Sequence, residues 1–217
     1  MQEMYQVYEV ECQIDDKICG GIPKEGDLIK AWVEASTGYD DEMAQKIIEE
    51  TTTQVATEEI EKVKEKRSWN CFKRDEKGLY IESRQVKALL KECANILKGT
   101  KGATPIIDIR NLKHKLAERV FVEPPRIYLG TAEPNGHIER GIHVWTAQGP
   151  RNAIKRADYV MQPCLQFRLR VLNDGLITED VLRKILIHGQ LIGIGADRSQ
   201  GYGKYTLLRL ELQTLPK

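Results

Sequence analysis

The sequence has no apolar run that approaches the roughly 20 residues of a membrane-spanning helix. Its first residues, MQEMYQVYEVECQIDD, also lack the charged and then apolar order of a secretory signal. Neither sign of charge is in excess, because 33 Lys and Arg residues balance 32 Asp and Glu residues. We therefore expect no membrane partner, and a nucleic-acid binder with this balance must segregate its charge.

Metal-binding and catalytic signatures are absent as well. The five cysteines are odd in number and widely spaced, and no CxxC pair suggests a zinc site or a disulfide framework. The four histidines form no HExxH pair, and the sequence contains no recognisable Ser-His-Asp or paired-carboxylate arrangement. These absences predict free thiols in a reducing, cytoplasmic setting, with no metal, no cofactor and no assigned catalytic residue.

Glycines cluster near the C-terminus, in the segment LIGIGADRSQGYGKY. Neither familiar phosphate loop fits this segment. The Walker pattern requires four residues between Gly and Gly-Lys, whereas five separate Gly195 from Gly201, and the dinucleotide fingerprint requires a third glycine where Arg198 stands. The segment also follows a helical pattern and precedes a strand pattern, which reverses the dinucleotide order. A nucleotide cofactor is therefore disfavoured.

The chemistry of this segment suits contact with a nucleic-acid backbone. Glycine permits positive φ and close approach, and successive free N–H groups in such a loop form an anion-binding concavity. Arg and Lys side chains add positive charge, and a tyrosine between glycines offers a face to a base or ribose. A tight helix-to-strand connection whose glycines serve only packing is the alternative. The candidate binding residues are Gly193, Gly195, Arg198, Ser199, Gly201, Tyr202, Gly203 and Lys204.

The order and spacing of GIGADRSQGYGKY resemble the C-terminal glycine-rich loop of the RAMP superfamily, the repeat-associated proteins that build CRISPR ribonucleoprotein complexes. The resemblance covers the last third of the chain and implies a ferredoxin-like, RRM-like domain whose loop approaches RNA. Two departures stand earlier in the chain. The family usually has Pro-Gly where Glu82-Ser83 stand, and a helix glycine near Ala88.

Residue alternation predicts the strands of such a fold. Tyr5–Ile14 alternates with apolar residues on both faces, which is typical of a central strand. Leu165–Leu172 alternates strictly, and Tyr205–Leu212 closes the chain as a further strand. The expected class is α+β, with a ferredoxin-like (RRM-like) β-α-β-β-α-β core, a helical insertion and a long hairpin.

Helical periodicity predicts the two core helices. The segment Leu79–Leu97 begins as a strand or loop and becomes an amphipathic helix, with Ser83 as a plausible N-cap. Thr178 is expected to cap a second helix that extends to about His188, which would place this histidine at a helix C-terminus.

We expect one RAMP-like domain over residues 1–217 with two additions. A helical insertion at residues 38–78 contains apolar residues at roughly helical spacing, and its charge run is expected to be a solvated face. A long hairpin is expected over residues 126–159. The resemblance implies that this hairpin is a thumb, which wedges into a guide–target duplex, and Arg151, Lys155 and Arg156 are its candidate contacts with RNA.

Four more basic residues are candidate contacts. Arg84 and Lys87 lie near a helix start, where the helix dipole favours anions, although a solvated helix end is the alternative. Arg168 and Arg170 project from one face of their strand, as RNA contacts of an RRM-like sheet do. The usual stacking aromatic residues are absent from that strand.

The resemblance implies an RNA-binding backbone subunit of a CRISPR-type ribonucleoprotein in antiviral defence. Such a subunit holds guide RNA by contacts with the RNA backbone, and it forms homo-oligomers along the RNA beside other subunits. Two alternatives stay open. One is a metal-independent endoribonuclease that processes repeat RNA, and the other is a solitary or viral relative that binds single-stranded DNA or other protein subunits.

Overall fold

A computed structural model describes residues 4–23, 68–100, 102, 104–146 and 149–213. The chain divides into two units where one domain was expected. Unit 1 comprises Met1–Ile18, Tyr80–Gly130 and Met161–Lys217, and unit 2 comprises Cys19–Leu79 and Thr131–Val160. In these described ranges, no helix is long and apolar enough to cross a lipid bilayer.

Unit 1 is built on a four-stranded sheet in the order β12-β1-β11-β7. All neighbouring strands are antiparallel. Along the chain, the core elements are β1 (Tyr5–Ile14), α3 (Ser83–Leu97), β7 (Val120–Glu123), β11 (Cys164–Leu172), α5 (Glu179–Ile192) and β12 (Tyr205–Leu212). This is the β-α-β-β-α-β order along the chain. Across the sheet, the four strands lie in the order fourth, first, third, second. The predicted ferredoxin-like α+β fold is confirmed.

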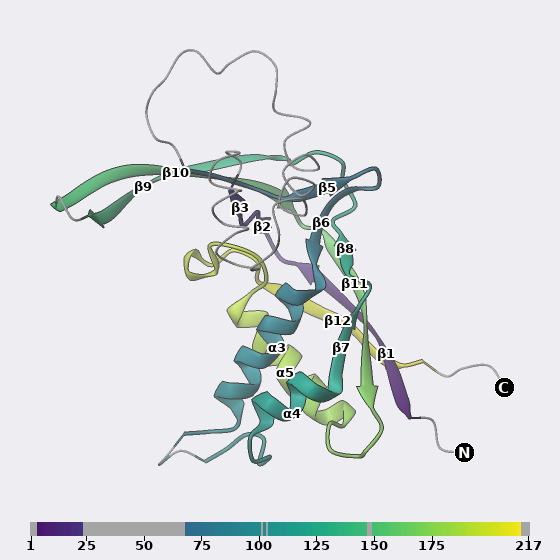
Figure 1. Ribbon diagram of the computed structural model, residues 1–217. Helices are drawn as coiled ribbons and strands as arrows, with labels where there is room; N and C mark the ends of the chain where they lie inside the picture. The colour runs from purple at the N-terminus through teal and green to yellow at the C-terminus, as the bar shows by residue number, and fades with distance from the viewer. Residues whose placement is uncertain (1–3, 24–67, 101, 103, 147–148, 214–217) are drawn as a thin grey trace, which may run out of the picture. The chain divides into compact units, whose positions relative to one another are not determined.

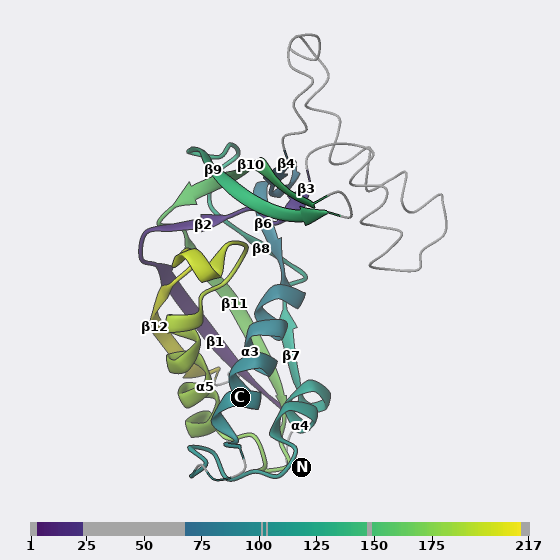
Figure 2. The ribbon, with the colours of Figure 1, turned by 90° about the vertical axis from the view of Figure 1, so that its left-hand side faces the viewer.

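Helices α3 and α5 cover one face of this sheet (Figure 1, Figure 2). The alternation of β11 explains why, because Leu165, Phe167, Leu169 and Val171 are buried whereas the residues between them are exposed. The helices contribute matching apolar stripes, formed in α3 by Val86, Leu89, Leu90 and Cys93 and in α5 by Val181, Leu182, Ile185 and Leu186. Burial of each large aliphatic side chain contributes about 1.5–3 kcal/mol, so this helix–sheet interface is the core of unit 1.

The ends of the two helices differ in part from the prediction. Thr178 is the N-cap of α5, and its hydroxyl accepts a hydrogen bond from the Val181 amide at 3.4 Å. Ser83 is not the N-cap of α3, because Glu82 holds that position and Ser83 is already helical. Helix α5 was predicted to end at about His188, but it continues to Ile192. His188 therefore lies one turn before the C-terminus of the helix and not at it.

Two shorter elements complete unit 1. Helix α4 (Leu112–Arg119) precedes β7 and buries Leu112 and Leu116. Strand β8 (Arg126–Tyr128) pairs with residues 80–82 of β6 (Gly78–Glu82), whereas β5 (Lys73–Asp75) belongs to unit 2. The first part of the segment expected as a hairpin therefore pairs elsewhere.

Unit 2 contains the long hairpin. Strands β9 (Gly136–Thr146) and β10 (Gly149–Met161) pair from Gly136 opposite Tyr159 to Thr146 opposite Gly149. Their sheet has the order β2-β10-β4-β3, with β9 paired to β10, and its short strands are β2 (Lys17–Cys19), β3 (Ile22–Pro23) and β4 (Ser68–Cys71). Of the expected helical insertion, residues 38–67 lie outside the described residues. Residues 68–78 form β4, β5 and the start of β6 instead of a helix.

Candidate nucleic-acid interface

The glycine-rich segment forms a loop whose neck is closed by two glycines. The Ile194 amide donates a hydrogen bond to the Gly203 carbonyl at 2.8 Å. Gly193 and Gly203 adopt positive φ, +86° and +75°. A Cβ on Gly193 would lie 2.8 Å from the Tyr202 carbonyl oxygen, and one on Gly203 would lie 1.8 Å from that of Ile194. Close packing therefore accounts for these two glycines, as the alternative interpretation of the sequence proposed.

The tip of the loop is exposed. It contains the 3-10 turn η1 (Arg198–Gln200), which lies between two residues in the left-handed region, Asp197 at φ 54° and Gly201 at φ 88°. Among the described residues, no heavy atom lies within 4 Å of the position that a Cβ on Gly201 would take. Ser199 and Gln200 are exposed, whereas Gly193, Ile194 and Gly203 at the neck are buried. The loop thus presents a solvent-facing turn on a buried base.

The prediction of successive free amides is wrong at five positions of the loop. The N–H groups of Gly193, Ile194, Gln200, Gly201 and Gly203 donate to the carbonyls of Gly189, Gly203, Asp197, Arg198 and Lys17, respectively, at 2.8–2.9 Å. These bonds close the loop on itself and join it to Lys17 at the start of β2. The positive φ angles of the loop glycines allow the tight turns and the close approach of backbone segments. Contact with a polyanion must therefore come mainly from side chains at the tip.

Cationic side chains surround this tip. Arg198 forms an ion pair with Glu92 of α3, with 2.8 Å between Nη1 and Oε2. Lys17 Nζ lies 5.7 Å from the centroid of the Tyr202 ring, in a cation–π contact, and 3.8 Å from Oδ2 of Asp16. Lys204 is exposed, and no carboxylate in the described part of the chain pairs with it. The tip therefore combines an aromatic ring and the exposed Lys204 with two cations, Lys17 and Arg198, that also have carboxylate partners.

The two candidates at the start of α3 have different environments. Arg84 is exposed and forms an ion pair with Glu82 at 2.7 Å. The Lys87 ammonium turns toward α4 and donates to the carbonyls of Leu116, Ala117 and Val120. Burial, together with neighbouring Lys91, lowers the pKa of Lys87 to about 8. The structure thus gives Lys87 the role of capping the C-terminus of α4.

Arg168 and Arg170 lie on the sheet face opposite the helices, as their alternation predicts, and both are exposed. Arg170 donates two hydrogen bonds to Glu123, at 2.9 and 3.2 Å. Arg168 lies directly opposite Glu9 on one side and Glu123 on the other, and cross-strand partners share a face. These carboxylates reduce the attraction of this face for a polyanion.

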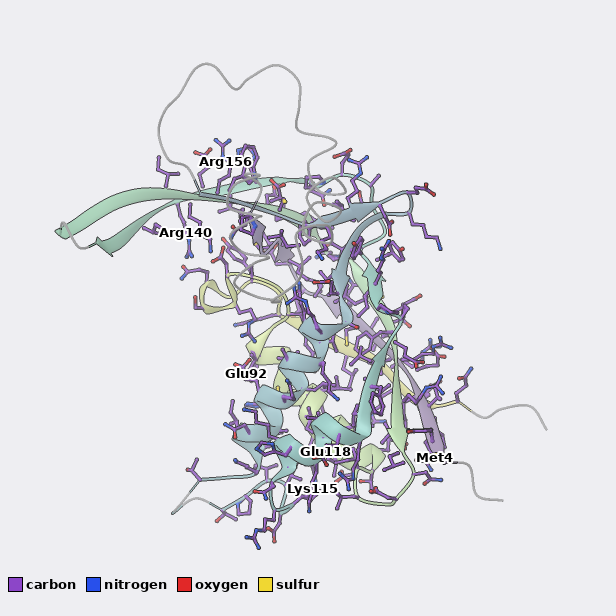
Figure 3. The ribbon with its side chains drawn as sticks, in the orientation of Figure 1. Met4, Glu92, Lys115, Glu118, Arg140 and Arg156 are labelled. Atoms are coloured by element: carbon purple, nitrogen blue, oxygen red, sulfur yellow. The ribbon has the colours of Figure 1, made fainter. Side chains whose placement is uncertain are left out.

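The hairpin candidates belong to unit 2. Arg156 lies opposite Glu139 and forms an ion pair with it, and its guanidinium stacks 4.3 Å from the centroid of the Trp69 ring. Lys155 lies opposite Arg140, and Arg151 lies opposite Val144. Arg140 and Arg156 project from opposite faces of the hairpin (Figure 3). Arg156 is therefore engaged within unit 2, and Arg140 and Lys155 lie opposite one another on the other face of the hairpin.

Lys17 and Glu92 were not among the residues predicted from the sequence. Lys17 lies near Tyr202 because its carbonyl accepts a hydrogen bond from the Gly203 amide of the loop, and no sequence pattern links the two. Glu92 had a partial signal, because the periodicity of α3 places it on the exposed side of the helix, away from Leu89, Leu90 and Cys93.

The described ranges contain no cluster of three or more His, Cys, Asp or Glu side chains that could hold a metal ion. All five cysteines are free thiols. Burial raises the pKa of Cys93 to about 12 and that of Cys164 to about 11, so these thiols are protonated at neutral pH.

No protein-family model matches the chain, and no curated protein matches it. Two of the solved structures that are similar to it are CRISPR complexes. One is a chain of a Type III-B Cmr-beta complex bound to cognate target RNA, with 13% identity, a TM-score of 0.49 and coverage of 96% of this chain. The other belongs to a Type IV-B CRISPR complex, with 12% identity, a TM-score of 0.45 and coverage of 97% of this chain and 94% of that one. The chain spans 61% of the length of the Cmr-beta chain. At these TM-scores the similarity carries no functional assignment, and the fold rests on the strand order described above.

Proposed function

We propose that this chain is an RNA-binding, RAMP-like protein that acts as a backbone-type subunit of a CRISPR-type ribonucleoprotein. Two features support the proposal. The fold of unit 1 is the ferredoxin-like arrangement that the RAMP resemblance implies, and the residues that carry the resemblance form one loop at the end of α5. In this role the protein works in the cytoplasm and in antiviral defence, and copies of it assemble along guide RNA beside other subunits.

The observation that carries the proposal is the exposed tip of the glycine-rich loop. Its neck is fixed by glycine packing and by the hydrogen bond from Ile194 to Gly203, whereas Ser199, Gln200 and Lys204 are exposed. Lys204, Lys17 and Arg198 lie around the tip, and Tyr202 supplies a ring face. A cationic, partly aromatic surface suits the phosphates and bases of a single strand with little preference for sequence. Binding should weaken steeply as salt concentration rises.

The test is fluorescence anisotropy with labelled single-stranded RNA at several salt concentrations. We expect the double variant Arg198→Gln, Lys204→Gln to bind more weakly than the wild type, with a shallower dependence on salt. A matched control is Arg183→Gln, Lys184→Gln on α5, where both cations already pair with carboxylates of the same helix. The proposal fails if the wild type does not bind RNA at low salt, or if the loop variant binds as tightly as the control.

A strand of the same sequence in DNA separates the proposal from its nearest alternative. Preference for RNA supports a role in a guide-RNA complex, because the 2′-hydroxyl is the group that distinguishes the two strands. Equal or tighter binding of the DNA strand would favour the solitary relative that binds single-stranded DNA.

A further inference from the structure

Many cations on the surface of unit 1 have a carboxylate partner. The ion pairs are Lys17–Asp16, Arg84–Glu82, Arg119–Asp174, Arg170–Glu123, Arg183–Glu179, Lys184–Asp180, Arg198–Glu92 and Arg209–Glu11, at 2.7–3.9 Å. Four of the cations that lack such a partner within the described residues come from one stretch of the chain. They are Lys98, Arg110, Lys113 and Lys115, which we call the basic patch.

The backbone holds this stretch together. The amides of Ile106 and Ile107 both donate to the Leu97 carbonyl at 3.0 Å, which ties the segment after the helix back to the C-terminus of α3. Leu112 and Leu116 are fully buried and anchor α4 against the core. Because these two leucines face inward, Lys113 and Arg110 remain exposed at the surface. Lys115 and Glu118 mark this end of unit 1 (Figure 3).

Little negative charge offsets the patch. Glu118 and Asp174 share one partner, Arg119, at 3.0 and 2.7 Å, so together the three residues leave one negative charge. Asp108 is the acidic residue within the stretch between Lys98 and Lys115. The patch therefore has a local excess of positive charge in a chain whose net charge is only +1.

Folding stability does not explain these cations. Lys113 and Lys115 lie in the first turn of α4, which contains no acidic residue. The helix dipole favours anions there and disfavours cations. These cations oppose the helix dipole, and no carboxylate within the described residues pairs with them. They are therefore suited to a negatively charged ligand.

We propose that the basic patch is a second contact for the RNA strand that the glycine-rich loop binds, an inference that rests on the proposed function. Helices α3 and α5 are antiparallel in this fold, and the patch follows α3 whereas the loop follows α5 (Figure 1, Figure 2). The two contacts therefore lie at opposite ends of the helical layer. The 15 residues of α3 span about 22 Å at 1.5 Å per residue, which is the separation of the patch from the Lys204 end of the loop. Arg198 lies nearer to the patch, because it pairs with Glu92, five residues before the end of α3. A strand that advances about 3.4 Å per nucleotide covers the full distance with about seven nucleotides.

The test uses RNA strands of about four and about twelve nucleotides, because only the longer one can extend from Lys204 to the patch. The patch variant is Arg110→Gln, Lys113→Gln, Lys115→Gln. The control, Arg183→Gln, Lys184→Gln, Arg209→Gln, changes the net charge equally but removes cations that have carboxylate partners. We expect the patch variant to bind the long strand about tenfold more weakly than the control. Its salt slope should fall by about 2, at 0.7 per lost phosphate contact, and its affinity for the short strand should not change.

Three outcomes separate the two proposals. If the wild type binds the long strand and the patch variant binds it like the control, the second contact is refuted while the proposed function stands. If the patch variant weakens binding but the loop variant does not, the assignment of the loop is refuted and the basic patch stands. If the wild type binds neither strand at low salt, both proposals fail. Urea denaturation provides a further check, because a patch with a purely structural role would make the patch variant less stable than the wild type.

Discussion

Gly203 packs against Ile194 so closely that a Cβ would lie 1.8 Å from the Ile194 carbonyl oxygen. We expect Gly203→Ala to open the neck of the loop, with a loss of about 3 kcal/mol or more from the clash, the positive φ and the broken hydrogen bond. Gly201→Ala meets nothing within 4 Å among the described residues, so it should lose only the 1–2 kcal/mol or so of a left-handed alanine. Urea denaturation measures both losses. If Gly203→Ala and Gly201→Ala lose equal stability, the loop does not have a packed neck and an open tip.

The ion pair between Arg198 and Glu92 limits the charge that the loop presents. The two side chains are 36% and 43% exposed, and such pairs contribute about 0.2–1 kcal/mol. We expect Glu92→Gln to leave stability nearly unchanged and to tighten RNA binding by about two- to fivefold, because the guanidinium is released. Titration of labelled RNA at low salt measures this change.

The control for this prediction is Glu179→Gln, which removes the same charge from the partner of Arg183 on α5. Its effect on RNA affinity should be clearly smaller. If the two variants tighten binding equally, the gain comes from net charge alone and not from release of Arg198.

Lys87 should give unit 1 a pH-dependent stability. Burial lowers its pKa to about 8 in the folded state, whereas an unfolded lysine titrates near about 10.4. Between these values the unfolded state binds more protons than the folded state, so this group makes the free energy of unfolding rise as pH increases from 8 to 10. Lys87→Met should remove that rise. The measurement is urea denaturation of both proteins at pH 7.5 and pH 9.5, and parallel pH profiles would refute the assignment.

The central strands and the second core helix could be predicted because each is fixed by local pattern. Strand β11 alternates over its whole length, and Thr178 has the side chain and position of an N-cap. The N-cap of α3 could not be predicted in this way. Glu82 enters that helix from a strand paired with Arg126, and Ser83 donates its amide to Pro125, so tertiary pairing decides where α3 begins.

The candidate site also has features that could be predicted from local pattern and features that could not. The glycines of the loop could be identified from their spacing, but spacing does not distinguish a free amide from one bonded to Lys17 or Gly189. The same limit applies to Lys87, whose partners are carbonyls that follow it by some 30 residues. Sequence pattern found the residues of the site, and long-range contacts determined which of them could face a ligand.

Gly189 offers a test of how α5 is seated on the sheet. A Cβ at this position would lie 2.5 Å from the Tyr205 hydroxyl, which donates a hydrogen bond to the Leu186 carbonyl at 2.7 Å. In an open helix Gly→Ala would gain about 0.5–1 kcal/mol. Here we expect Gly189→Ala to lose about 1–3 kcal/mol, because the added methyl group overpacks the interface.

Tyr205→Phe alone should cost about 1 kcal/mol through the lost hydrogen bond. The double variant Gly189→Ala, Tyr205→Phe should lose about 1 kcal/mol less than the sum of the two single losses. Removal of the hydroxyl makes room for the new methyl group. Tyr8→Phe is the control, since its hydroxyl bonds Gln6 at 3.1 Å in β1, and its loss should simply add to that of Gly189→Ala. If the losses of Gly189→Ala and Tyr205→Phe are additive, this hydroxyl does not set the position of α5. It then does not fix where the loop begins.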